Sequence, residues 1–390
     1  MHVNGFLHKI LLSVIPKKRL TTLILLVAGL LQSKKLSVTE LGRGIITPLP
    51  THERSGIRRA DRFLANKKLH KELKLVYSQQ ISCLVGTKKR PKIIVDWTHI
   101  PNTNFHAIRA ALVAEGRALI LYEEVHPEKK LSNVKTEKNF LKTLKSLLPS
   151  GCKPIIITDA GFRNPWFKQV IELEWDYVGR VRGTHTYYDG NHWMKCTDLF
   201  SRATKNAKYI GKVVLCKKIP ITTHLFLLKE KSKKELWRKK YKRRQGGKKD
   251  DLSYSKGAND PWVLASSLPG TSPVKILRVI KSYKSRMQIE EGFRDLKNPK
   301  YGFGLRNAYS RDTKRVAVML LIAMLATLIA WLFGYVAEKN NWQYQFQVNS
   351  IKNRRVLSLF FLGCRVIKRK IEVTEAMLES VFIDIQAYSR

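Results

Sequence analysis

The chain is organised around the stretch Tyr283-Lys-Ser-Arg286-Met-Gln-Ile-Glu290-Glu-Gly-Phe-Arg-Asp-Leu-Lys297, which predicts a helix. At roughly 100° per residue, Tyr283, Arg286, Glu290 and Lys297 fall within about 60° of one another on one face. Such a face suits a site that binds a metal ion through the carboxylate and phosphates through the other three groups. A solvated face with an Arg286–Glu290 ion pair explains the same pattern, so the remaining chain must supply the partners of a site.

The charge balance indicates what the protein binds. The 390 residues include 73 Lys and Arg against 30 Asp and Glu, a formal net charge of +43, and 44% are hydrophobic. The length predicts one large domain with an appended module, or two to three domains, with enough apolar residues for a core. An excess of positive charge this large destabilises a compact protein unless a polyanion neutralises it. Nucleic acid is therefore the expected partner, with a membrane surface as the alternative.

The cysteines indicate a reducing compartment. They are odd in number and widely spaced, and the first residues lack the features of a signal peptide. We therefore expect a cytoplasmic protein with free thiols. A zinc site is conceivable, although its spacing fits no familiar pattern; its ligands would be His185, His192, Cys196 and Cys216.

One apolar segment raises the question of a membrane anchor. Val316–Val336 contains no charged residue and is long enough to span a bilayer, whereas the apolar run Leu20–Leu31 is too short. A helix buried between the layers of a large α/β core is also apolar on all sides. We expect burial and keep the anchor as the alternative.

Residues 1–75 read as a basic helical region. Ser37 and Glu40 form a capping box at the start of one helix, and Thr51–Lys68 predicts another with a strongly basic face. Short helices that end in a basic helix suit a module that lays one helix on duplex DNA, although a solvated basic face explains the charges too. The candidate DNA contacts are Arg54, Arg58, Arg59, Arg62 and Lys67.

From residue 92 the pattern changes to strands. Lys92–Thr98 predicts a buried strand that ends near Asp96, and residues 107–125 predict a hairpin turning at Glu115-Gly116-Arg117. A second buried strand ends at Asp159. Helices over 136–148 and 164–174 and a strand over 177–182 complete a mixed sheet with helices on its faces.

Residues 183–260 interrupt this order and predict an insertion. Turn signals and two short strands, 212–216 and 224–228, are followed by a basic stretch, 229–256, of the kind that lacks structure without a partner. The chain then returns to a strand at Trp262, continues as the helix 273–297, and ends in amphipathic helices over 352–390.

Three acids suggest a metal site. Asp96 and Asp159 lie at strand ends and Glu290 lies on the helix, and buried acids are costly unless they are paired or bind metal. Each alone could be a simple cap. Together their hard oxygen ligands suit Mg²⁺, and a pair of such ions can activate the attacking oxygen and stabilise the leaving oxygen of a phosphodiester.

These motifs resemble the DDE transposases of bacterial insertion sequences, in the insertion-sequence-four family that includes the transposon-ten and transposon-five enzymes. The likeness is closer to the former and covers nearly the whole chain. It rests on Val-Asp96-Trp-Thr, Thr-Asp159-Ala-Gly-Phe-Arg and the spacing Tyr283-x2-Arg286-x3-Glu290-x6-Lys297, with further matches at residues 36–43, 57–67 and 261–265.

The resemblance implies a fold and a division of the chain. The fold is α/β, a ribonuclease-H-like mixed sheet with flanking helices, a β-rich insertion before the catalytic helix and an N-terminal helical DNA-binding module. The implied parts are the module, residues 1–75; the catalytic domain, 76–335, with the insertion at about 183–260; and a C-terminal helical region, 336–390, suited to dimer contact.

The resemblance also implies roles for residues. Asp96, Asp159 and Glu290 would be the catalytic metal ligands, Glu290 being preferred over Glu291 by its spacing. A flipped base near the cleavage site would stack on Trp262, although Trp262 could equally be core packing, and Met287 stands where some relatives carry a second aromatic residue. Transposon-end phosphates would be held by Tyr283, Arg286, Lys297 and Arg182.

The implied activity is cut-and-paste transposition. The enzyme would bind terminal inverted repeats as a homodimer, cleave the ends by hydrolysis through a hairpin intermediate, and join 3′ hydroxyl ends to target DNA. Two Mg²⁺ ions are expected, with Mn²⁺ as a substitute, in a cytoplasmic, nucleoid-associated bacterial protein that does not bind membranes. A host nuclease without strand transfer and a non-enzymatic DNA-binding protein are the alternatives.

Overall fold

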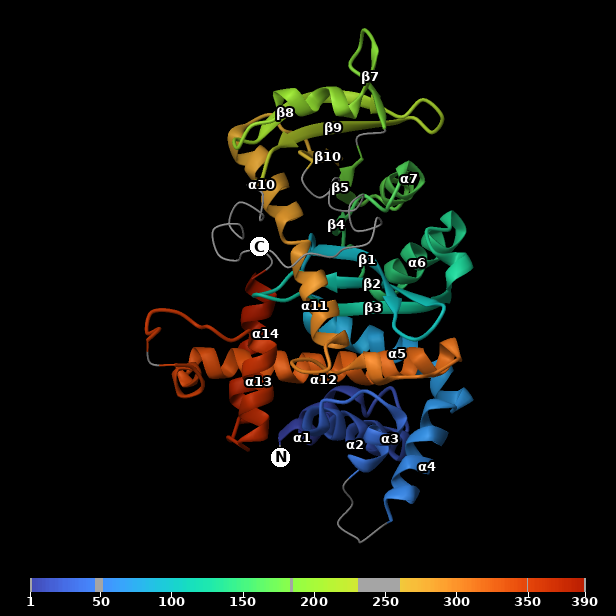
Figure 1. Ribbon diagram of the computed structural model, residues 1–390, viewed down its shortest axis with the longest axis vertical. Helices are drawn as coiled ribbons and strands as arrows, with labels where there is room; N and C mark the ends of the chain where they lie inside the picture. The colour runs from blue at the N-terminus through green and yellow to red at the C-terminus, as the bar shows by residue number, and fades with distance from the viewer. Residues whose placement is uncertain (1, 46–51, 183–184, 231–259, 349, 389–390) are drawn as a thin grey trace, which may run out of the picture. The chain divides into compact units, whose positions relative to one another are not determined.

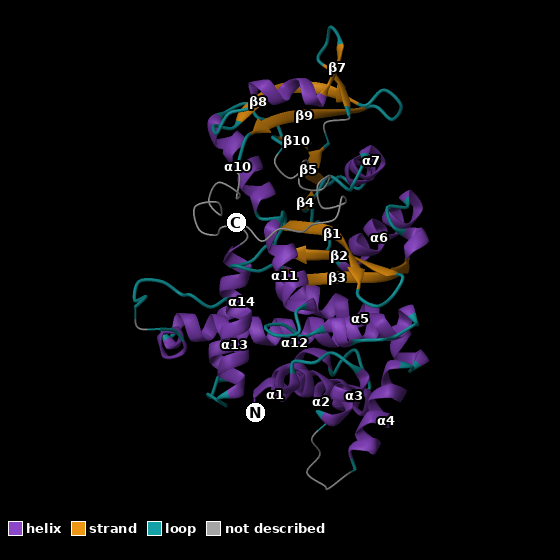
Figure 2. Ribbon diagram, viewed as in Figure 1, coloured by secondary structure: helices purple, strands orange, loops and turns teal. Residues whose placement is uncertain are grey.

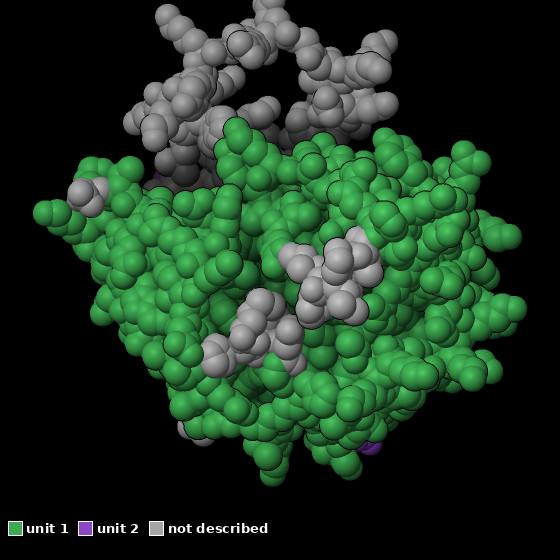
Figure 3. Space-filling model, turned by 90° about the horizontal axis from the view of Figure 1, so that it is seen from below, with its two compact units in different colours: residues 1–154, 287–390 green, residues 155–286 purple. Residues whose placement is uncertain are grey.

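The chain forms two compact units in the computed structural model, which describes residues 2–45, 52–182, 185–230, 260–348 and 350–388. Unit 1 consists of Met1–Pro154 with Met287–Arg390, and unit 2 of Ile155–Arg286 (Figure 3, with unit 1 in green). The basic stretch predicted at 229–256 lies almost entirely outside the described residues. The three-part division inferred from the sequence stays a prediction.

Unit 1 contains a short antiparallel sheet and most of the helices (Figure 1). Strand β2 pairs with β1 on one side and β3 on the other. The strands are β1 (Lys92–Ile100), β2 (Phe105–Leu112) and β3 (Leu119–Pro127). The helices are α1 (His2–Leu11), α2 (Lys17–Ser33), α3 (Val38–Arg43), α4 (Glu53–Leu64), α5 (Lys67–Val85), η1 (Glu128–Lys130), α6 (Val134–Leu147), α11 (Met287–Lys297), η3 (Leu305–Asn307), α12 (Thr313–Lys339), η4 (Trp342–Phe346), α13 (Leu359–Lys368) and α14 (Glu375–Tyr388).

The apolar helix α12 is the centre of unit 1. It lies between α2 and strand β3 and packs most extensively on α13 (Figure 1). Two glycines permit this close crossing, because a Cβ at Gly363 would overlap the carbonyl oxygen of Ala330, and one at Gly334 would overlap that of Leu359. The helix is apolar and long enough to span a bilayer by composition alone, but 89% of its most apolar window is buried inside the structure. The expected burial is therefore confirmed.

Unit 2 is built on a second set of strands (Figure 2, orange). Their order is β4-β5-β10-β9-β8-β6-β7, with β4 and β5 parallel and the other described pairs antiparallel. The elements are β4 (Ile155–Thr158), α7 (Asn164–Glu172), β5 (Asp176–Val181), β6 (Thr186–Tyr188), β7 (Trp193–Lys195), η2 (Cys196–Arg202), β8 (Lys208–Leu215), β9 (Ile221–Leu228), β10 (Trp262–Ser266) and α10 (Pro273–Lys284).

The mixed α/β class predicted from the sequence is confirmed. The predicted hairpin is present as β2 and β3, and Asp159 directly follows β4 as expected. Asp96 differs, because β1 continues to Ile100 and the aspartate therefore lies within the strand rather than at its end. The described strands of residues 183–260 add to the same sheet, since β9 pairs with β10.

The helical N-terminal region differs from expectation at one boundary. Ser37 caps α3 by accepting the backbone N–H of Glu40, as predicted. The helix expected over Thr51–Lys68 is instead two helices, because Asn66 caps a new helix by accepting the backbone N–H groups of Lys68 and Leu69. The Asn66 side chain therefore starts a new helix at a place where the periodicity of the sequence indicated one continuous helix.

The helix expected over 273–297 is broken. Helix α10 ends at Lys284 and α11 begins at Met287. Ser285 donates its hydroxyl to the carbonyl oxygen of Ser282 at 2.6 Å, and the backbone N–H of Arg286 donates to Tyr283 at 3.0 Å, which tightens the last turn. Tyr283 and Arg286 belong to unit 2, whereas Glu290 and Lys297 belong to α11 of unit 1.

Candidate active site

In unit 1, Asp96 belongs to a row of three charged residues across the sheet. Arg109 on β2 stands opposite Asp96 on β1 and also opposite Glu123 on β3. Directly opposed residues of antiparallel strands point to the same face of a sheet. One carboxylate oxygen of Asp96 accepts the backbone N–H of Trp97 at 2.8 Å, which orients the side chain.

Arg109 and Glu123 form a buried ion pair next to Asp96. Arg109 is 2% exposed and Glu123 is 4% exposed, and their closest nitrogen and oxygen atoms are 2.7 Å apart. The guanidinium lies over the ring of Phe293 on α11, 4.8 Å from its centroid. Sequence reasoning missed this pair, although a charged residue inside each apolar run, 107–114 and 118–125, was the signal.

Lys297 points from α11 toward strand β1. Its ammonium donates to Thr98 Oγ1 at 2.6 Å and lies 5.7 Å from the centroid of Phe293. Burial lowers the pKa of Lys297 to about 8, with the positive charges of Arg109 and Arg306 acting in the same direction and Asp96 opposing them. Glu290 lies seven residues, about two turns, before Lys297 and shares its face of α11. Unit 1 thus supplies two acids and a cation.

The lowered pKa of Lys297 predicts a pH dependence. The folded protein releases this proton near pH 8 and the unfolded chain near 10.5, so this group makes the fold more stable as pH rises between the two values. Its charge, and with it any phosphate contact, is lost as pH rises above about 8. We expect the affinity for DNA to fall above pH 8 and Lys297→Arg to remove this fall, as measured by fluorescence anisotropy between pH 6.5 and 9.5. A wild-type affinity that is constant across this range would contradict the assignment.

In unit 2, Asp159 faces an aromatic and basic group. One of its carboxylate oxygens accepts the backbone N–H of Gly161 at 2.7 Å, and a Cβ at Gly161 would lie only 2.9 Å from that oxygen. Tyr283 is 4% exposed, and burial raises the pKa of its phenol. Arg286 and Arg180 lower this pKa and Asp159 raises it, which means that all three charges act on the tyrosine. Arg180, on β5, was not predicted.

Trp262 belongs to the same group. Its ring packs edge-to-face on Tyr283, with centroids 4.9 Å apart and planes at 75°. The guanidinium carbon of Arg286 lies 5.9 Å from the centroid of Tyr283. Arg182 follows β5; burial lowers the pKa of His185, and the charges of Arg163 and Arg182 act in the same direction. Unit 2 therefore brings together Trp262, Tyr283 and Arg286, while Arg182 acts on a different neighbour.

The basic residues predicted for DNA contact lie on α4 and at the start of α5. Arg54, Arg58 and Arg62 are exposed and follow one another at four-residue intervals along α4. Arg59 points elsewhere, because its guanidinium donates to the hydroxyl of Thr22 on α2 at 2.9 Å. The exposed residues thus form one basic helix face, and Lys67 is exposed at the start of the next helix.

The acids of the predicted metal site are divided between the units, Asp96 and Glu290 in unit 1 and Asp159 in unit 2. Within the described part of the chain, neither unit contains three histidine, cysteine, aspartate or glutamate side chains grouped to hold a metal ion. This holds for the alternative zinc ligands too, all of which belong to unit 2: His185, His192, Cys196 and Cys216.

Comparison with known proteins gives one family. Residues 87–328 match the family model described as "Transposase DDE domain", which is more than half of the chain. No curated protein matches the sequence. Among solved structures, one similar chain is a piggyBac transposase in a synaptic complex with hairpin DNA; the two are 11% identical, the match covers 94% of this chain and 75% of that chain, and the TM-score is 0.40.

Proposed function

The chain belongs to the DDE transposase family, whose members are enzymes that cleave DNA and transfer strands, and we propose that it is a cut-and-paste transposase of the insertion-sequence-four type. Such an enzyme binds the terminal inverted repeats of its element, cleaves the ends through a hairpin intermediate, and joins the 3′ hydroxyl ends to target DNA. The motif spacing Tyr283-x2-Arg286-x3-Glu290-x6-Lys297 supports the transposon-ten-like subtype.

The proposed metal ligands are Asp96, Asp159 and Glu290. The donor set fits Mg²⁺ or Mn²⁺, because all three provide hard carboxylate oxygens. Asp96 and Asp159 each hold one oxygen through a neighbouring backbone N–H, which orients the carboxylate for a ligand. A pair of divalent ions would activate the attacking oxygen and stabilise the leaving oxygen at the phosphorus. The protein's task is to hold the acids and the scissile phosphate in place.

The observation that carries the proposal is that charged or phenolic side chains interact with Asp96 in unit 1 and with Asp159 in unit 2. In unit 1, the ammonium of Lys297 lies close enough to Asp96 for the aspartate to raise its pKa. In unit 2, the charges of Asp159, Arg180 and Arg286 all act on the pKa of Tyr283, which burial raises. Cations and a phenol beside a metal-binding acid suit phosphate oxygens, since the cations neutralise negative charge and the phenol donates a hydrogen bond. We assign the phosphate contacts to Tyr283, Arg286 and Lys297, with Arg182 as a further contact.

Trp262 suits the role of stacking partner for a flipped base. It is partly exposed, and its edge-to-face contact with Tyr283 fixes the direction of the indole before DNA arrives. Stacking on an aromatic side chain offsets part of the cost of extruding a base. We therefore assign Trp262 to base stacking next to the phosphate contacts.

The basic face of α4 supports the proposal that residues 1–75 recognise the ends, because Arg54, Arg58 and Arg62 are exposed along one helix side. We also propose a ribonuclease-H-like catalytic domain over 76–335 with a β-rich insertion, and a dimer contact through 336–390. The protein would act at the bacterial nucleoid as a homodimer on paired ends.

A reaction with the element's own ends tests the function. The DNA flanking the gene is searched for short inverted repeats, which are built into a linear substrate and incubated with protein, Mg²⁺ and a supercoiled target plasmid. We expect hairpin ends on the excised fragment and its 3′ ends joined to the plasmid. Cleavage without joining would instead identify a nuclease, and binding without cleavage would identify a DNA-binding protein.

A further inference from the structure

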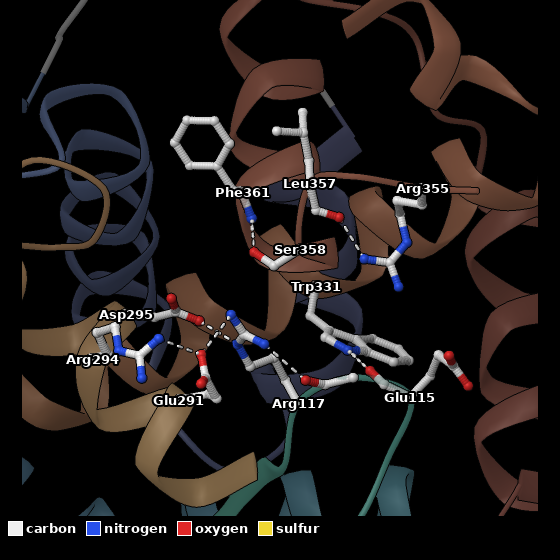
Figure 4. Close-up of polar contacts among 11 residues, drawn as sticks. Glu115, Arg117, Glu291, Arg294, Asp295, Trp331, Arg355, Leu357, Ser358 and Phe361 are labelled. Atoms are coloured by element: carbon white, nitrogen blue, oxygen red, sulfur yellow. Dashed lines mark hydrogen bonds and ion pairs between the residues drawn. The ribbon is translucent and has the colours of Figure 1, made fainter. Parts of the chain in front are cut away.

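The turn between β2 and β3 contacts α11 at two places. At the first, the side-chain amide of Gln288 donates to the carbonyl oxygen of Ala114 at 2.9 Å and accepts its backbone N–H at 3.3 Å. At the second, Arg117 Nε donates to a carboxylate oxygen of Asp295 at 2.7 Å, and another of its nitrogens lies 3.5 Å from Glu291 (Figure 4). One short turn thus contacts both ends of the helix.

This turn is itself fixed to the interior of unit 1. Gly116 adopts a positive φ of 65°, and Arg117 donates its backbone N–H to Glu115 at 2.8 Å, which makes the turn tight. The carbonyl oxygen of Glu115 accepts the indole N–H of Trp331 at 3.0 Å (Figure 4). Trp331 is 1% exposed and belongs to the buried helix α12. The turn is therefore a fixed support for the residues that bind it.

The residues held by the turn occupy the side of α11 opposite the proposed active-site residues. At roughly 100° per residue, Gln288, Glu291 and Asp295 fall within about 60° of one another. Glu290 and Lys297 fall about 180° away from Gln288. The buried residues between the two sides, Ile289, Phe293 and Leu296, form a third face that packs into unit 1.

We propose that Arg117 is a positioning residue that fixes the rotation and the axial position of α11, and through them the direction of Glu290. The inference rests on the proposed role of Glu290 as a metal ligand. The two contacts are seven residues apart, roughly 10 Å along the helix. A single contact would let the helix turn or slide, whereas two contacts with a fixed support resist both movements.

The inference also explains the two consecutive glutamates. Glu291 pairs with Arg294 at 2.9 Å as well as lying near Arg117, so its carboxylate holds the helix to its support. The side chains of Arg117 and Asp295 are only 17% and 14% exposed, and ion pairs shielded in this way are less weakened by salt than surface pairs. Glu290 is the metal ligand and Glu291 is part of the support.

Arg117→Gln tests this role, with Arg355→Gln as the matched control. Arg355 is equally buried, at 17% exposure, and one of its guanidinium nitrogens would lie 3.8 Å from a Cβ placed at Gly116 of the same turn. Its ion pair, however, is with Glu338 of α12 rather than with α11. Three quantities are measured on the full-length protein: hydrogen exchange of the peptide 287–297, Mn²⁺ affinity by electron paramagnetic resonance with end DNA bound, and the cleavage rate at saturating DNA.

We expect Arg117→Gln to speed exchange in 287–297, weaken Mn²⁺ binding and lower the cleavage rate about 10-fold to 100-fold, as misplacement of a reacting group by about 1 Å can do. Arg355→Gln should leave all three near wild type even if it lowers the melting temperature equally. Equal effects of the two variants, or a wild-type rate in Arg117→Gln, would overturn the inference. Glu290→Gln tests the proposed metal site separately. If this variant cleaves normally, Glu290 is not a metal ligand, and the hydrogen-exchange data alone then decide whether Arg117 holds α11.

Discussion

Replacing Asp96 with asparagine is expected to lower the rate of end cleavage about 10³-fold or more. A metal ion stabilises the transition state by several kcal/mol, and about 4 kcal/mol corresponds to a factor of roughly 10³ in rate. Asparagine keeps an oxygen that can accept the backbone N–H of Trp97, so the strand geometry is preserved while the negative charge is lost. The measurement is single-turnover cleavage of end DNA in Mg²⁺.

The control for this variant is an acid that takes no part in the site. Glu128 is exposed in the short helix η1 of the same unit, and Glu128→Gln removes the same charge from the surface. We expect Glu128→Gln to cleave at the wild-type rate and Asp96→Asn to bind end DNA with wild-type affinity. An Asp96→Asn protein that cleaves normally in Mg²⁺ would remove Asp96 from the catalytic assignment.

The second large effect is expected at Arg109. Replacing Arg109 with methionine leaves the carboxylate of Glu123 buried without its cation, and breaking a buried ion pair in this way costs about 3–5 kcal/mol. We expect the free energy of unfolding of unit 1, from urea titration, to fall by this amount. Removing both charges leaves no uncompensated ion, so the double variant Arg109→Met, Glu123→Met should recover most of the loss.

The double variant also separates stability from catalysis. Arg109 lies opposite Asp96 and acts on the pKa of Lys297. If the double variant folds well, its loss of the guanidinium should raise the pKa of Lys297 and shift the fall in DNA affinity to higher pH. A cost below about 1 kcal/mol for Arg109→Met alone would contradict the burial argument.

Local sequence patterns correctly predicted the elements whose structure depends mainly on neighbouring residues in the chain. The hairpin 107–125, the acid after β4 and the apolar helix α12 all follow from runs of apolar residues and turn residues that read the same in any context. The position of Asp96 within its strand could not be predicted in this way. Pairing with β2 extends β1 to Ile100, and such pairing depends on a segment outside β1 itself.

Three other features could not be predicted because they depend on competing or distant contacts. The continuous helix over 273–297 was wrong, since Ser285 bonds to Ser282 and tightens the turn where periodicity alone showed no break. Arg117 was seen only as a turn residue, because its partners Asp295 and Glu291 lie far along the chain. The Arg109–Glu123 pair was missed because it depends on the register of two strands, which places Arg109 on β2 opposite Glu123 on β3.

The break in the helix changes how the motif is understood. The spacing from Tyr283 to Lys297 no longer describes one helix face. It describes two groups joined by a short turn: Tyr283 and Arg286 with Asp159 in unit 2, and Glu290 and Lys297 with Asp96 in unit 1. Each group contains at least one acid and one cation, which is the combination that the proposed metal-dependent phosphodiester chemistry would need.

The central proposal is that the Asp159 carboxylate is a direct ligand of a catalytic divalent ion, and Asp159→Cys tests it most directly. Mn²⁺ accepts a sulfur ligand more readily than Mg²⁺ does, so a metal ligand replaced by cysteine should respond to the choice of ion. We predict that Asp159→Cys does not cleave end DNA in Mg²⁺ but regains cleavage in Mn²⁺, while Asp159→Asn stays inactive in both. Equal cleavage rates of Asp159→Cys in the two metals would contradict direct metal binding by Asp159.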